Sequence, residues 1–90
     1  MSKTVLYFTA TWCGPCQQIK PTYKKCVESY KNITFHMIDV DDEQNKNLLD
    51  TYSIQSMPTF IFLNGNRVTG QMNGADANRL IVLCNNLATA

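Results

Sequence analysis

The sequence predicts an α/β domain in which a four-stranded mixed sheet carries helices on both faces, in the order βαβαββα. The run Thr4–Phe8 is β-branched and aromatic without polar alternation, which is typical of a strand covered on both faces. A helical pattern and a second strand pattern follow it, as a parallel pair of strands requires. Asn64-Gly65 then separates two further strand patterns, which indicates an antiparallel hairpin.

The first helix is expected to begin beside Cys13. Thr9–Trp12 forms a loop after the first strand, and the helix runs from Cys13 to about Tyr30. Its predicted buried residues recur at helical spacing: Ile19, Tyr23, Cys26, Val27 and Tyr30. Pro21 lies inside this helix, removes one backbone donor and should kink it. Ile33–Val40 is predicted as the second strand, parallel to the first.

The second half of the chain is expected to add a helix, the hairpin and a final helix. The acidic residues Asp41–Glu43 suit the first turn of a helix. That helix carries Leu48, Leu49 and Tyr52. Thr59–Leu63 pairs with Arg67–Met72 in the hairpin, and Asn73-Gly74 closes the second strand. Asp76 can cap the last helix, which is expected to bury Leu80, Ile81, Leu83, Cys84 and Leu87.

Length, charge and composition restrict the class of protein. With 90 residues the chain suits one domain, residues 1–90, and we expect a monomer. A formal net charge of +1 gives no electrostatic footprint for nucleic acid or for an anionic membrane. The apolar run Val5–Phe8 is too short for a signal peptide or a membrane span, so we expect a cytoplasmic protein. In that compartment a close cysteine pair indicates redox or metal chemistry.

Cys13 and Cys16 are separated by two residues where a strand passes into a helix. At the helix N-terminus Cys13 meets free backbone N–H groups and the positive end of the dipole, which favour its thiolate. The spacing therefore predicts Cys13 as a nucleophile and the less exposed Cys16 as the resolving thiol. Pro15 suits the first helical turn, and Gly14 removes bulk where another protein must approach.

These residues resemble the thioredoxin family. Trp12-Cys13-Gly14-Pro15-Cys16 matches the active-site sequence of that family at every position. The resemblance continues through Pro21, the segment Met57-Pro58-Thr59, Gly65 and Gly74, and it covers nearly the whole chain. It implies a minimal thioredoxin-like fold and a protein dithiol–disulfide oxidoreductase, concerned with electron transport and cell redox homeostasis.

The resemblance also implies site residues and partners. Cys13 would attack a substrate disulfide and Cys16 would expel the reduced product. Pro58 would be cis beside the pair, with the Met57 backbone pairing to the substrate chain. Met57, Gly74 and Ala75 would complete an apolar rim, and we expect the Trp12 ring to form a docking surface. The partners would be disulfide-containing proteins and a thioredoxin reductase as electron donor, with no cofactor beyond the Cys13–Cys16 disulfide.

The sequence departs from the family at three places. Only twelve residues precede Cys13, so we expect a trimmed sheet with a less protected edge. Tyr7 stands where the family has a buried aspartate, six residues before the nucleophile. Met37 stands where the family has the lysine that neighbours this aspartate. We therefore expect an active enzyme in which activation of Cys16 depends on water or substrate.

Other interpretations of these residues stay open. Zinc usually needs a second close pair, and only Cys26, Cys84 and His36 remain, far apart in the sequence; we expect no metal site. Cys26 and Cys84 are either regulatory thiols or, as we expect from their apolar helical positions, inert core residues. His36 is expected to lie on the sheet without a catalytic role. A glutaredoxin-like enzyme recharged by glutathione and a non-catalytic binding module are the alternative functions.

Overall fold

The computed structural model describes residues 2–90, and its order of elements is the predicted βαβαββα with one short 3-10 helix added. In chain order the elements are β1 (Lys3–Thr9), α1 (Gly14–Ser29), β2 (Ile33–Asp39), the 3-10 helix η1 (Glu43–Asn45), α2 (Lys46–Thr51), β3 (Thr59–Asn64), β4 (Arg67–Asn73) and α3 (Ala77–Ala88). The α/β class predicted from the sequence is therefore confirmed.

The four strands form one mixed sheet in the order β2-β1-β3-β4. β1 is parallel to β2 and antiparallel to β3, and β3 and β4 form the antiparallel hairpin. Gly65 in the hairpin turn has a φ of 63°, a conformation that favours glycine. Because β1 is internal, the loop that leaves its C-terminal end emerges from the middle of the sheet, where α/β proteins usually place their sites.

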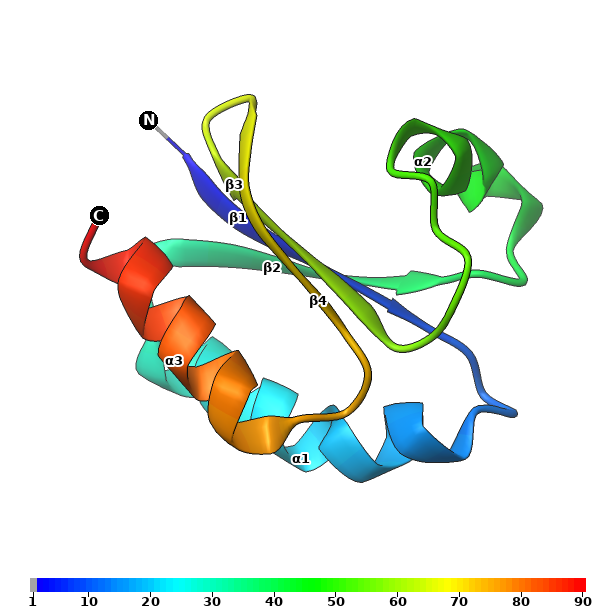
Figure 1. The fold of residues 1–90 in the computed structure, drawn as a ribbon, viewed down its shortest axis with the longest axis horizontal. Helices are drawn as coiled ribbons and strands as arrows, with labels where there is room; N and C mark the ends of the chain where they lie inside the picture. The colour runs from blue at the N-terminus through cyan, green and yellow to red at the C-terminus, as the bar shows by residue number, and fades with distance from the viewer. Residues whose placement is uncertain (1) are drawn as a thin grey trace.

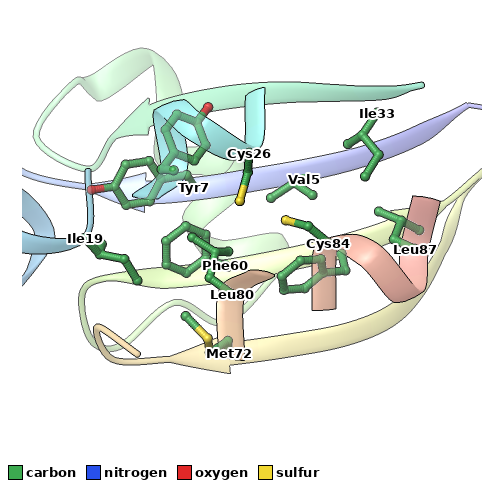
Figure 2. Packing of buried hydrophobic residues seen from close by; sticks show 12 residues of the cluster. Val5, Tyr7, Ile19, Cys26, Ile33, Phe60, Met72, Leu80, Cys84 and Leu87 are labelled. Atoms are coloured by element: carbon green, nitrogen blue, oxygen red, sulfur yellow. The ribbon is translucent and has the colours of Figure 1, made fainter. Parts of the chain in front are cut away.

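Helices cover both faces of the sheet, as Figure 1 shows: α1 and α3 lie on one face and α2 lies on the other. Side chains alternate along β1, so that Val5 and Tyr7 face α1 and α3 while Leu6 and Phe8 face the side of α2. The larger core cluster contains Val5, Tyr7, Ile19, Tyr23, Cys26, Ile33, Phe60, Phe62, Met72, Leu80, Cys84 and Leu87 (Figure 2). The larger part of the core therefore lies between the sheet and the two helices α1 and α3.

The structure corrects three details of the sequence-based prediction. The second helix is short, because Asp42 caps the 3-10 helix η1 and α2 begins only at Lys46. Val27, which was expected in the core, is 38% exposed, and Ile81 in α3 is 44% exposed. Both lie beside the buried stripe of their helix, which is narrower than the run of apolar residues in the sequence.

Helix termini follow the sequence signals more closely. Asp76 caps α3 as predicted, since its side chain accepts a hydrogen bond from the Arg79 N–H at 3.1 Å. Pro21 lies inside α1. Within residues 2–90 no helix combines the length and the apolar character that a membrane crossing needs.

Candidate active site

Cys13 occupies the N-cap position of α1. Its backbone is extended, its N–H donates to the Ala10 carbonyl at 3.2 Å, and its carbonyl accepts the first helical bond from Gln17. Its Sγ accepts a hydrogen bond from the Cys16 N–H at 3.2 Å, in the role that a serine or aspartate oxygen plays in other caps. The first cysteine therefore lies directly against the free N–H groups of the helix, as predicted.

Cys13 and Cys16 form a disulfide, with their Cα atoms 5.3 Å apart. Cys16 is fully enclosed, while Cys13 retains 6% of its surface. Both pack against Ala10, with Val40 and Met57 beside them. The ordering of exposure expected from the sequence holds, although the difference between the two residues in this disulfide form is small.

Exposed residues surround the outer sulfur. Gly14 and Pro15 are exposed in the first turn of α1, and a Cβ atom on Gly14 would meet nothing within 4 Å. Trp12 is 66% exposed, and its Nε1–H donates to Asp41 Oδ2 at 2.7 Å. The bond was not foreseen from the sequence, where Asp41 was assigned only to a helix start. The run of acids at 41–43 was the available signal, because the cap of η1 uses only Asp42.

A second chain segment reaches the disulfide from the start of β3. The Met57–Pro58 peptide bond is cis, and Met57 packs on the cluster that contains both sulfurs. Gly74, with a φ of 95°, donates its N–H to the Pro58 carbonyl at 2.9 Å and so attaches the end of β4 to this segment. Ala75 follows on the exposed surface. The fold thus brings Met57, Pro58 and Gly74 together from distant parts of the sequence.

Tyr7 is buried beneath the redox pair, in the middle of β1. Its hydroxyl donates a hydrogen bond of 2.6 Å to the backbone carbonyl of Cys16. Burial raises the pKa of Tyr7 above its usual value of 10.0. Met37 is the register partner of Tyr7 on β2 and is 45% exposed. The sequence flagged Tyr7 as unusual, but it contained no sign of the bond to Cys16.

The remaining candidate residues lie away from the disulfide. Cys26 and Cys84 are free and buried within the large core cluster, and His36 is exposed on β2. Burial raises the pKa of both thiols. In the part of the chain that the structure describes, no three His, Cys, Asp or Glu side chains are grouped so as to hold a metal ion.

Comparison with known sequences shows the relationship of the chain. The family model described as Thioredoxin matches residues 1–86. The thioredoxin of Homo sapiens is 39% identical over 83 residues, which are 92% of this chain and 77% of that protein. The mitochondrial thioredoxin O1 of Arabidopsis thaliana is 35% identical over 77 residues, 86% of this chain and 40% of that protein.

Comparison with solved structures leads to the same family. Oxidised thioredoxin O2 from Arabidopsis thaliana superposes with a TM-score of 0.89 at 30% identity, covering 97% of this chain and 76% of that one. The short form of spinach chloroplast thioredoxin f gives a TM-score of 0.88 at 32% identity over 99% and 78% of the two chains. With its Cys13–Cys16 disulfide at the start of α1, the chain belongs to the thioredoxin family of thiol–disulfide oxidoreductases.

Proposed function

We propose that this protein reduces disulfide bonds in other proteins, with Cys13 as the nucleophile and Cys16 as the resolving thiol. The observation that carries the proposal is the hydrogen bond of 3.2 Å from the Cys16 N–H to Cys13 Sγ at the start of α1. In the reduced protein this N–H and the helix dipole favour a thiolate at Cys13. The thiolate is the form of cysteine that attacks a disulfide.

The reaction proceeds through two exchanges and transfers two electrons. The Cys13 thiolate attacks one sulfur of the substrate disulfide, forms a mixed disulfide with it and releases the other substrate sulfur as a thiolate. Cys16 then loses its proton and attacks Cys13 Sγ. The Cys13–Cys16 disulfide forms, the second substrate sulfur leaves as a thiolate, and the substrate has gained both electrons.

The substrate protein docks on the rim around Cys13. Trp12 supplies an exposed aromatic surface that Asp41 holds in place, and the open space above Gly14 admits another backbone. The segment Met57-Pro58, with the turn at Gly74 and Ala75 attached to it, completes this rim. The supporting observation is that Met57, beside the cis-proline, packs against the cluster that contains Cys13 and Cys16, while Trp12, Gly14 and Pro15 of the motif are exposed.

The partners and the compartment complete the proposal. The protein acts as a monomeric single domain in the cytoplasm, needs no cofactor beyond its own disulfide, and is recharged by a thioredoxin reductase. A cytosolic poise of roughly −220 to −320 mV would keep such a pair largely reduced. A net charge of +1 gives no electrostatic attraction toward nucleic acid or membranes.

The test is insulin reduction together with capture of mixed disulfides. Cys13→Ser should abolish reduction, Cys16→Ser should accumulate covalent partners on Cys13, and Cys26→Ala should retain activity as the matched cysteine control. Activity that survives Cys13→Ser would overturn the assignment. Supplying either a thioredoxin reductase or glutathione as electron donor separates the proposal from the glutaredoxin-like alternative, and a wild-type protein inactive with both would support a binding module.

A further inference from the structure

The side chain of Tyr7 is buried and contacts α1 at Cys16. The two exchange steps described above do not use it. Its hydroxyl donates to the Cys16 carbonyl at 2.6 Å in the interior of the protein. That carbonyl belongs to the residue proposed to resolve the mixed disulfide. The contact joins the central strand of the sheet to the inner cysteine across nine positions of the sequence.

The Tyr7 ring is held in place from several directions. It stacks on Phe60, with ring centroids 4.7 Å apart and an interplanar angle of 3° (Figure 2). The centroid of the Tyr23 ring lies 4.6 Å from that of Tyr7. The backbone of Tyr7 pairs with both neighbouring strands, β2 and β3. The hydroxyl therefore occupies a fixed point beneath the disulfide, because neither the ring nor the backbone has room to move.

The N-terminal part of α1, beside this hydroxyl, is held by fewer contacts than the Tyr7 ring. Gly14 and Pro15 in its first turn are exposed, and a side chain at position 14 would contact nothing within 4 Å. Pro21 lacks an N–H, so the carbonyl of Gln17 loses its usual helical donor. Cys16 lies between the exposed first turn and Pro21. The hydrogen bond from Tyr7 fixes the carbonyl of Cys16 in this part of the helix.

Tyr7 acts as a donor and not as a base. Burial raises its pKa above 10.0, so the hydroxyl keeps its proton throughout the physiological range. A protonated phenol can hold the Cys16 carbonyl, but it cannot accept the proton that the Cys16 thiol releases. Its influence on the chemistry must therefore be geometric.

We propose that Tyr7 is a positioning residue that holds Cys16 within reach of Cys13 and thereby accelerates the second exchange. After the first exchange Cys13 is bonded to the substrate sulfur, and only attack by Cys16 on Cys13 Sγ completes the reaction. The rate of that step depends on how closely Cys16 is held, as in any intramolecular reaction. In the first exchange Cys16 contributes only its backbone N–H to the Cys13 thiolate. Tyr7 binds the carbonyl of Cys16 and not this N–H, so the first exchange should keep its rate without the Tyr7 hydroxyl.

The test is Tyr7→Phe, which keeps the ring and removes only the hydroxyl. Stopped-flow reaction of the reduced protein with an aromatic disulfide such as DTNB releases one coloured thiolate in each exchange, so both steps are visible. The first phase should keep its rate. The second should slow by about three- to tenfold, the effect of losing one buried hydrogen bond. The reduction potential should become less negative, because the reduced pair is less well arranged for closure.

Tyr23→Phe is the matched control. It removes the hydroxyl of the neighbouring ring in the same cluster, and no hydrogen bond links that hydroxyl to Cys16 among the contacts of residues 2–90. Both phases and the reduction potential should stay at wild-type values in this variant. A second phase slowed equally in both variants would show a general loosening of the core and would overturn the proposal.

The pH profile separates positioning from proton transfer. In Tyr7→Phe the plateau of the second phase should fall while its midpoint pH stays constant; a shifted midpoint would show that Tyr7 affects ionisation and would overturn the geometric role. Equal second phases in wild type and Tyr7→Phe would also overturn it. The inference rests on the proposed roles of Cys13 and Cys16, but an absent first phase in wild type would contradict those roles instead.

Discussion

Two cysteine pairs lie in the same small protein, and they have opposite chemistry. Cys13 and Cys16 open α1 and form a disulfide. Cys26 lies three turns further along α1, and it faces Cys84 of α3 with both thiols free (Figure 2). Both thiols belong to the same buried core cluster. Proximity of two sulfurs is therefore common to both pairs.

Position within the fold separates the pairs. The first pair lies at a helix N-terminus, where unpaired N–H groups favour a thiolate, and it borders the surface. The second pair is 2% and 0% exposed between two helices and the sheet, where burial raises the pKa of both thiols above 9.0. The comparison shows that a thiol is reactive when its thiolate is stabilised and when a reagent can reach the sulfur. Burial in the core removes both conditions.

The largest expected difference is in alkylation. In the reduced protein at neutral pH, iodoacetamide should modify Cys13 roughly a thousandfold faster than Cys26 or Cys84, because the buried thiols react only after the core opens. Peptide mass spectrometry of timed samples gives the three rates. Adding denaturant should bring them together. Comparable alkylation rates of Cys13, Cys26 and Cys84 in the native protein would show that the two pairs do not differ in reactivity.

The second expected difference is the response of stability to alkaline pH. Cys26, Cys84, Tyr7 and Tyr23 all have pKa values raised by burial, that of Tyr23 to about 12. Their neutral forms are favoured by folding, so their contribution is complete below pH 9 and is lost as the pH rises toward the folded-state pKa values. The free energy of unfolding should fall above pH 9, by no more than about 1.4 kcal/mol per pH unit for each group.

Urea titrations between pH 7 and pH 11 measure this loss. Cys84→Ala should make the slope above pH 9 shallower, since it removes one of the buried acids whose pKa burial raises. The Cys13–Cys16 pair contributes nothing to the slope in the oxidised protein, because disulfide sulfurs do not titrate. A slope unchanged by Cys84→Ala would show that the buried pair does not respond as argued.

The smallest expected effect concerns stability at neutral pH. Cys84→Ala should lower the free energy of unfolding by about 1–2 kcal/mol, since it leaves a small cavity in the main core cluster. Disulfide reduction by this variant should stay at the wild-type rate. Val82→Ala on the same helix is the control, because Val82 is 55% exposed and should cost no more than about 0.5 kcal/mol. A loss of activity in Cys84→Ala would show that the buried thiols contribute to disulfide reduction, contrary to this comparison.

Local patterns in the sequence were sufficient for much of the fold. The apolar run of β1, the Asn64-Gly65 turn and the cap at Asp76 each act over a few residues, and all three are confirmed. Burial of Val27 and Ile81 was predicted wrongly. Helical spacing shows which residues can face the sheet, but it does not show how much of the helix surface the sheet covers.

The sequence by itself determined the order of elements, the strand-to-helix junction at Cys13 and the resemblance carried by Trp12–Cys16. Only the tertiary structure decided that Tyr7 reaches the Cys16 carbonyl, that Asp41 holds Trp12 and that Cys26 faces Cys84. The physical reason is range: helix, strand and turn preferences arise between near neighbours in the chain. Contacts between distant residues depend on how strands and helices pack, and packing is settled only when the whole core is assembled.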